Sequence, residues 1–173
     1  TRRLEEAIDD HVCAVMLEPI QGEGGVVCPG ADYLREVRRL CDERKLLLIF
    51  DEVQVGMGRT GRLFAHEHYR VTPDIMTLAK ALGNGLPMGA MLAREDLESA
   101  FGPGSHATTF GGTPLVSEVS RAVLSSLLQD GWIDHCREVG RYFKGRLEEL
   151  ASKFECIRQV RGLGLILGVE LDR

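Results

Sequence analysis

The chain contains 173 residues, of which 44% are hydrophobic and 27% are charged, and its formal net charge is −5. This is the composition of an ordinary globular protein with one main core. The negative charge gives no electrostatic reason to expect nucleic acid or an anionic membrane as a partner. No apolar run approaches the roughly 20 residues of a membrane span, and no signal peptide is visible at the start. We therefore expect no nucleic-acid and no membrane partner.

The cysteine and histidine patterns argue against a disulfide framework and against a metal centre. The five cysteines are an odd number and none forms a CxxC pair, so we expect reduced thiols, a cytoplasmic location and no zinc. The segment His66-Glu67-His68 lacks the i, i+4 histidine spacing of a helical zinc site. We interpret this segment as a solvated surface.

Strands and helices alternate along most of the chain. Apolar residues at every third or fourth position predict a helix over 31–44. Short apolar runs bounded by turn residues predict buried strands at 12–17, 46–50, 74–78 and 88–92. This order of strand, helix and strand indicates right-handed crossovers and an α/β fold, with a mostly parallel sheet and flanking helices.

The last third of the chain has a different character. Apolar stripes predict two long helices, over 115–128 and 133–152. This change indicates a second, smaller lobe, so we expect one domain over 1–129 and another over 130–173. The last predicted elements are a strand over 156–160 and a strand over 164–171, with a turn between them at Arg161-Gly162-Leu163.

Two residues in the first domain have the chemistry that a pyridoxal cofactor needs. Asp51 follows the apolar strand 46–50, and ligands of open α/β sheets bind beyond the carboxyl ends of the strands. Lys80 is followed by Gly83 and Gly85, which allow the backbone to approach a ligand closely. A lysine amine condenses with the aldehyde, and a carboxylate keeps the pyridine nitrogen protonated. The alternative is that Asp51 only caps a turn and that Lys80 is one of many solvated lysines.

Six ordered motifs give the chain a resemblance to a known family. It resembles the class III aminotransferases, fold-type-I pyridoxal phosphate enzymes that include acetylornithine and ornithine aminotransferases. The motifs that carry the resemblance span nearly the whole chain: Glu18-Pro19-Ile20-Gln21-Gly22-Glu23-Gly24-Gly25, Phe50-Asp51-Glu52-Val53-Gln54, Gly56-Met57-Gly58-Arg59-Thr60-Gly61, Ala79-Lys80-Ala81-Leu82-Gly83-Asn84-Gly85, Thr108-Thr109-Phe110-Gly111-Gly112 and Val160-Arg161-Gly162-Leu163-Gly164. The resemblance implies part of the large pyridoxal-phosphate-binding domain over 1–129 and the start of a small α+β C-terminal domain over 130–173.

The resemblance also implies roles for residues around the cofactor, pyridoxal 5'-phosphate. Lys80 matches the Schiff-base lysine, whose freed amine later moves the proton between the substrate carbon and the cofactor. Asp51 matches the partner of the pyridine nitrogen, and Gln54 matches the residue that hydrogen-bonds the ring hydroxyl. Thr109 matches the threonine that reaches the cofactor phosphate of the neighbouring subunit, which implies a homodimer with shared active sites.

Two further positions match substrate-binding residues of the family. Thr108 matches a position that lines the substrate in acetylornithine-type enzymes. Glu23 resembles the gating glutamate of the ornithine-type subgroup, where it pairs with an arginine that otherwise grips a substrate carboxylate. The alternatives are that Thr108 and Thr109 are turn residues beside Gly111-Gly112 and that Glu23 is a solvated loop charge.

For the intact protein, the resemblance implies transamination between an N-acylated or free basic amino acid and 2-oxoglutarate, as in arginine biosynthesis. The segment Gln21-Gly22-Glu23-Gly24 favours an acetylornithine- or ornithine-like amino donor. A 4-aminobutyrate aminotransferase is the next alternative. A glutamate-semialdehyde aminomutase has the same fold and needs no 2-oxoglutarate. In the family, the phosphate cradle comes from an amino-terminal portion that this sequence does not contain. We therefore expect a piece of a longer protein, and a non-catalytic fragment is a further alternative.

Overall fold

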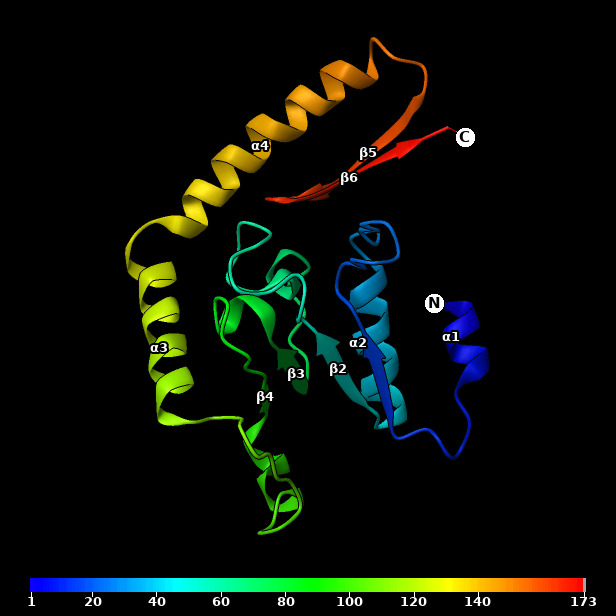
Figure 1. The fold of residues 1–173 in the computed structure, drawn as a ribbon. Coiled ribbons are helices and arrows are strands. Elements are labelled where there is room, and N and C mark those ends of the chain that lie inside the picture. Colours follow the sequence, from blue (N-terminus) through cyan, green and yellow to red (C-terminus); the bar gives the residue numbers. More distant parts are fainter. Residues whose placement is uncertain (173) are drawn as a thin grey trace.

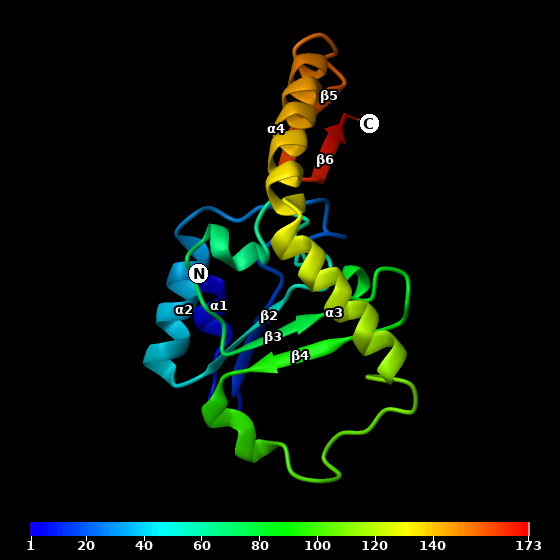
Figure 2. The same cartoon turned by 90° about the vertical axis from the view of Figure 1, so that its left-hand side faces the viewer.

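The first four strands form one sheet in which the three leading strands are parallel. In the computed structural model, which describes residues 1–172, the strands are β1 (Ala14–Leu17), β2 (Leu47–Asp51), β3 (Ile75–Leu78) and β4 (Ala90–Ala93), in the spatial order β1-β2-β3-β4. β1 pairs with β2 and β2 with β3 in parallel, whereas β4 runs antiparallel to β3. The expected mostly parallel sheet is confirmed (Figures 1 and 2).

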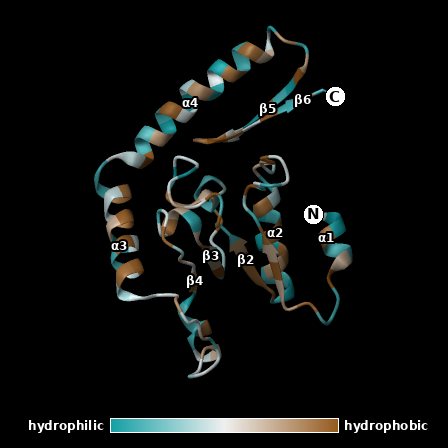
Figure 3. Ribbon diagram, in the orientation of Figure 1, coloured by the Kyte–Doolittle hydropathy of each residue, from teal (hydrophilic) through white to brown (hydrophobic). Residues whose placement is uncertain are grey.

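One face of this sheet carries the hydrophobic core. Successive strand residues point to opposite faces, and in β2 the buried positions are Leu48 and Phe50. Helix α2 (Tyr33–Arg44) packs its buried side chains, Leu34, Val37, Leu40 and Cys41, on this side. These four residues belong to the stripe that predicted the helix, so its apolar face is confirmed. Figure 3 shows the same concentration of apolar residues in the strands and along α2.

The other face of the sheet is open. It carries Met16, which is 56% exposed, and Met91, which is 47% exposed, together with half-buried Ile49 and Ile75. Asp51 lies on this open face, because it alternates with buried Phe50 along β2. A ligand that approaches Asp51 therefore meets an apolar surface on the same side of the sheet.

Two long helices follow, as the sequence predicted. Helix α3 (Pro114–Gln129) begins with proline at its first position, where the missing N–H has no helical partner to lose. Its residues Val123, Leu124 and Leu127 pack on a second core cluster beside β3. Helix α4 (Trp132–Ala151) packs instead against β5 (Ile157–Leu163) and β6 (Ile166–Leu171). The domain boundary near residue 130 stays a prediction. Within residues 1–172, no helix has the length and apolarity that crossing a membrane requires.

The turn predicted at Arg161-Gly162-Leu163 is wrong. These residues lie inside β5, and the reversal falls at Gly164 and Leu165, between β5 and β6. Gly162 has φ +118°, and a Cβ there would lie 2.0 Å from the carbonyl oxygen of Ile166. This glycine permits a close approach between two strands, and sequence alone does not separate that use of glycine from a turn.

The remaining helices are short. α1 (Arg2–Ala7) precedes the sheet, and three 3₁₀ helices lie in the connections: η1 (Ala65–His68), η2 (Lys80–Leu82) and η3 (Glu95–Ala100). The sequence patterns did not predict the 3₁₀ helices, because segments of three to six residues are too short to show a helical period. η2 begins at Lys80 itself.

The loop that follows β2 makes contacts with α4 and with the C-terminal hairpin formed by β5 and β6. The carbonyl oxygen of Arg59 accepts hydrogen bonds from Leu165 N at 3.0 Å and from Cys136 Sγ at 3.3 Å. A Cβ at Gly140 of α4 would lie 2.3 Å from Gly164 O, so the helix backbone lies directly on the hairpin turn. The segment that follows Asp51 is therefore fixed from the C-terminal side of the molecule.

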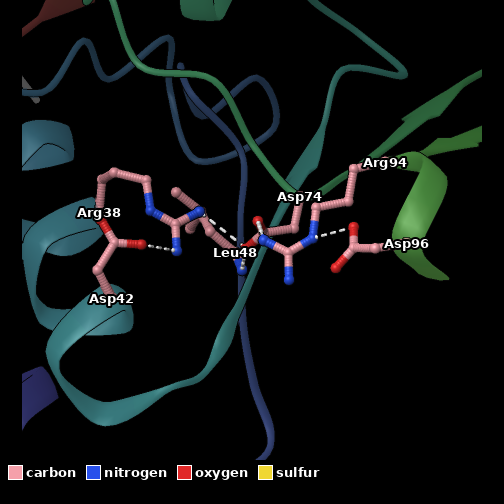
Figure 4. A network of polar contacts seen from close by, with 6 residues as sticks. All are labelled: Arg38, Asp42, Leu48, Asp74, Arg94 and Asp96. Carbon is pink, nitrogen blue, oxygen red and sulfur yellow. Dashed lines mark hydrogen bonds and ion pairs between the residues drawn. The ribbon is translucent and has the colours of Figure 1, made fainter.

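A buried carboxylate fixes the amino-terminal end of the sheet. Asp74 is 7% exposed; its Oδ2 accepts hydrogen bonds from Leu48 N (2.7 Å) and Arg38 Nη1 (2.8 Å), and its Oδ1 from Arg94 Nη1 (2.7 Å). Arg38 and Arg94 are held in turn by Asp42 and Asp96 (Figure 4). Burial alone would raise the pKa of Asp74, but the hydrogen bonds from Leu48 and Arg38 and the charges of both arginines outweigh it and lower the pKa below 3.8.

Candidate active site

The two residues singled out for pyridoxal chemistry lie at the carboxyl ends of adjacent parallel strands. Asp51 is the last residue of β2, and Lys80 follows β3 after a single intervening residue. β2 and β3 pair in register so that Asp51 lies opposite Thr77. This is the edge at which open α/β sheets bind ligands, and the structure confirms that both residues belong to it.

The Asp51 carboxylate is held through one of its two oxygens. Oδ1 accepts a hydrogen bond from Val53 N at 2.9 Å and another from Thr77 Oγ1 at 3.3 Å. Within residues 1–172, no hydrogen bond ends on Oδ2. An oriented carboxylate with one free oxygen on a half-exposed strand end is suited to accept a hydrogen bond from a protonated pyridine nitrogen.

Gln54 lies against the loop that carries Glu23. A Cβ built on Gly22 would lie 2.7 Å from Cδ and Oε1 of Gln54, so only glycine at position 22 leaves room for this amide. Gly22 N donates to Glu18 Oε2 at 2.9 Å, and the loop is closed by the bridge between Gln21 and Val27. The structure thus brings the Glu23 loop beside the Asp51–Gln54 segment, with Glu23 itself exposed.

Lys80 has an unusual backbone conformation. Its φ is +47°, in the left-handed region that side chains other than glycine seldom adopt. Such conformations persist where the surrounding structure imposes them, often at ligand sites. The next turn is tightly packed, because a Cβ at Gly83 would lie 2.1 Å from Leu86 O. Lys80 is exposed, and its amine makes no hydrogen bond or ion pair with residues 1–172, which leaves it available to a ligand.

Thr108 and Thr109 are not brought to the other site residues. Both are exposed and lie between η3 and α3, in the segment that runs below the sheet in Figure 1. Thr108 Oγ1 accepts a hydrogen bond from Gly111 N at 3.1 Å, which is the turn contact foreseen as its alternative role. Across residues 1–172, neither threonine makes a hydrogen bond to Asp51, Gln54 or Lys80.

Behind the site lies a buried carboxylate that the sequence reasoning missed. Glu52 is 1% exposed and points away from Asp51 into the core. It accepts hydrogen bonds from Ala65 N and His66 N, each at 2.8 Å, and lies 3.0 Å from His66 Nδ1. Its position directly after Asp51 at the end of an alternating strand was the signal that places it on the buried face.

The interpretation of His66-Glu67-His68 as a solvated surface is wrong for His66, whereas His68 is exposed as expected. The His66 side chain is 14% exposed and contacts Glu52, and His68 Nε2 lies 3.1 Å from Thr60 Oγ1. Partial burial lowers the pKa of His68, and the hydrogen bond that its ring donates to the Thr60 carbonyl oxygen only partly offsets this. Both imidazoles therefore help to hold the loops behind the site. Among the residues the structure describes, no group of three or more His, Cys, Asp or Glu is placed to hold a metal ion.

Comparison with known proteins places this arrangement in a family. The family model described as Aminotransferase class-III matches residues 1–173. The chain belongs to the class III aminotransferases, a family of pyridoxal-phosphate-dependent enzymes. It is 52% identical over 169 residues to the acetylornithine aminotransferase of Caldanaerobacter subterraneus subsp. tengcongensis, covering 98% of this chain and 43% of that protein. It is also 52% identical over 172 residues to the acetylornithine aminotransferase of Methanocaldococcus jannaschii, covering 98% of this chain and 42% of that protein.

Solved structures of aminotransferases have the same fold as this chain. The ornithine aminotransferase of Toxoplasma gondii superposes with a TM-score of 0.93 at 42% identity, covering 98% of this chain and 41% of that chain. The N-acetylornithine aminotransferase of Stenotrophomonas maltophilia gives a TM-score of 0.88 at 42% identity, over 99% of this chain and 45% of that chain. The chain thus spans less than half the length of these relatives.

Proposed function

We propose that this chain carries the lysine and the pyridine-binding carboxylate of an aminotransferase that uses pyridoxal 5'-phosphate. The donor is an acetylornithine- or ornithine-like basic amino acid, and the acceptor is 2-oxoglutarate. The observation that supports this most is the pair of adjacent strand ends: Asp51 offers a free Oδ2, and Lys80 offers a free amine. The names of the relatives support the class of donor.

Each residue has a defined task in this proposal. The cofactor supplies an aldehyde that condenses with an amine, with loss of water, and a protonated ring that withdraws electrons from the neighbouring carbon. Asp51 Oδ2 holds the proton on the ring nitrogen, and Gln54 donates to the ring hydroxyl. Lys80 Nζ holds the cofactor between turnovers and, once released, accepts the proton that leaves the substrate carbon.

The exposed threonines favour a shared site. Thr109 is exposed and, within residues 1–172, makes no hydrogen bond to Gln54 or Asp51, as expected of a residue that binds the cofactor phosphate of a second copy. We therefore include a homodimer in the proposal, with Thr108 and Glu23 lining the substrate. The five free cysteines support a reducing compartment, which we take to be the cytoplasm.

The first experiment tests the lysine. The chain is mixed with pyridoxal phosphate, reduced with borohydride and mapped by mass spectrometry. We expect one modified peptide, containing Lys80, and its loss in Lys80→Ala but not in Lys153→Ala, which removes another exposed lysine. Modification scattered over surface lysines would contradict the proposal for this chain and favour a non-catalytic role.

The second experiment tests the reaction class. Acetylornithine labelled with ¹⁵N is incubated with 2-oxoglutarate and the chain, and labelled glutamate is measured. Transfer that disappears in Lys80→Ala supports the proposal. Transfer from 4-aminobutyrate in preference to acetylornithine would move the assignment to that alternative. Isomerisation of glutamate semialdehyde without any need for 2-oxoglutarate would favour a mutase.

A further inference from the structure

The four-stranded sheet contains only two polar side chains, and they contact each other. The strands read Ala-Val-Met-Leu, Leu-Leu-Ile-Phe-Asp, Ile-Met-Thr-Leu and Ala-Met-Leu-Ala, so Asp51 and Thr77 are the exceptions. They are paired in register across β2 and β3. Thr77 Oγ1 donates to Asp51 Oδ1 at 3.3 Å.

The Thr77 hydroxyl is placed to orient the carboxylate. The Val53 N–H alone leaves the carboxylate plane free to rotate about a single hydrogen bond, whereas two donors on Oδ1 fix which way Oδ2 points. Thr77 is also tied to the same strand end through its backbone, because its carbonyl oxygen accepts from Glu52 N at 3.0 Å. The residue thus contacts Asp51 and its neighbour, and lies three positions before Lys80.

We propose that Thr77 is a positioning residue for the cofactor ring: its hydroxyl holds Asp51 so that Oδ2 meets the ring nitrogen. This inference rests on the proposed function, because it assigns Asp51 to that nitrogen. Thr77 acts through Asp51 and does not itself touch substrate. The sheet does not need a hydroxyl at this position for packing, since Ile75, the neighbour of Thr77 on the same face of β3, is apolar.

The test compares three variants of the protein loaded with pyridoxal phosphate. Thr77→Val keeps the shape of the side chain and removes the donor, and Thr77→Ser restores a hydroxyl. Thr60→Val is the matched control, because it makes the same change at a buried threonine whose hydroxyl contacts His68 and makes no hydrogen bond to Asp51. The measurements are the cofactor dissociation constant and the pH at which the visible absorbance of the bound cofactor titrates.

In Thr77→Val we expect the dissociation constant to rise about 3- to 10-fold, which corresponds to the loss of one ordinary hydrogen bond, because the 3.3 Å contact is a long one. The absorbance titration should move to higher pH, because it reports the nitrogen that joins Lys80 to the cofactor, and a ring that holds its proton less strongly withdraws less charge from that nitrogen. Thr77→Ser should recover both values towards wild type, and Thr60→Val should leave both unchanged.

The outcomes separate this inference from the proposed function. If the wild-type chain fails to fix pyridoxal phosphate on Lys80, the proposed function fails. If the wild type does so and Thr77→Val titrates as the wild type does, the role of Thr77 is overturned while the function stands. An equal shift in Thr60→Val would also overturn it, because that shift would reflect a general loss of packing.

Discussion

The two ends of the central sheet each present an aspartate, and the two are used in opposite ways. Asp74 precedes β3 at the amino-terminal end and accepts hydrogen bonds on both oxygens, from Arg38, Arg94 and the Leu48 backbone. Asp51 ends β2 at the carboxyl-terminal end and accepts on Oδ1 alone. A carboxylate whose two oxygens are both held by the protein stabilises the fold, whereas a carboxylate that is held through one oxygen is available to a ligand.

The backbone shows the same contrast. At the amino-terminal end, Asp74 N donates to Leu48 O at 2.8 Å and Arg94 N donates to Asp74 O at 3.0 Å, so the strands are joined by main chain and side chain together. At the carboxyl-terminal end, Lys80 and Asn84 have positive φ. Positive φ alone does not separate the two ends, because Lys45 and Arg70, which precede β2 and β3, also adopt it. The amino-terminal end differs in the side-chain and main-chain hydrogen bonds of Asp74, which make it the rigid support.

The largest effect should come from breaking the amino-terminal end. In Asp74→Ala, two arginines and the Leu48 N–H lose their acceptor, and removal of one partner from a buried ion pair costs about 3–5 kcal/mol. Urea unfolding should therefore show a much lower midpoint. The control is Asp42→Ala, because Asp42 also pairs with Arg38 but its own side chain is 64% exposed; we expect a loss of about 1 kcal/mol or less. Similar losses in both variants would contradict a special role for Asp74.

Protonation of Asp74 at low pH should remove its contribution to stability without a mutation. The pKa of Asp74 lies below its ordinary value of 3.8 in the folded chain. Its contribution is therefore complete above pH 3.8, and it is lost as the pH falls through the lower, folded-state pKa. Unfolding midpoints measured from pH 6 downward should fall less steeply in Asp74→Asn than in the wild type. Parallel curves would mean that other carboxylates dominate acid unfolding.

The sequence predicted the elements well because its apolar periods are local. Strands 12–17, 46–50 and 74–78 correspond to β1, β2 and β3, and the two long helices begin within one residue of their predicted starts. Asp51 and Lys80 were found for a related reason, since each follows an apolar run, and the end of a run marks the end of a strand.

The polar pairs were missed because they depend on register between strands. The hydrogen bond from Thr77 to Asp51 requires that β2 and β3 pair with these residues opposite each other. The three bonds to Asp74 come from α2, from β2 and from Arg94, which follows β4, and these donors are separated from Asp74 by 20 to 36 residues. No pattern within a single segment encodes such distances, and one residue of slip would exchange the buried and open faces.

At the carboxyl-terminal end, the equivalent substitution should barely affect stability. Asp51→Ala removes two hydrogen bonds from a half-exposed side chain, and the donors Val53 N and Thr77 Oγ1 remain close to water. We expect a change of about 1 kcal/mol or less in the free energy of unfolding. The same variant should lose most of its affinity for pyridoxal phosphate, as measured by fluorescence titration. A loss of stability as large as that of Asp74→Ala would remove the contrast between the two ends.

Gly22→Ala should have the smallest effect on stability, and it tests most directly whether the carboxyl-terminal end of the sheet serves ligand binding. In Gly22→Ala, the new Cβ would lie 2.7 Å from the terminal atoms of Gln54, a flexible side chain that turns aside at little cost. We expect the free energy of unfolding to change by about 0.5 kcal/mol or less. Gln54 then leaves its place against Gly22, so the loss of its proposed hydrogen bond to the cofactor should weaken cofactor binding about 2- to 10-fold.

Gly24→Ala in the same loop is the matched control for this prediction. Its Cβ would lie 3.2 Å from Gln21 Oε1 and would leave Gln54 in place. If Gly24→Ala weakens cofactor binding as much as Gly22→Ala does, the effect belongs to the loop as a whole and not to Gln54. If only Gly22→Ala weakens binding, a variant with almost unchanged stability has lost a contact to the cofactor. A loss of affinity without a loss of stability is expected at the carboxyl-terminal end of the sheet, which binds the ligand, and not at the amino-terminal end, which stabilises the fold.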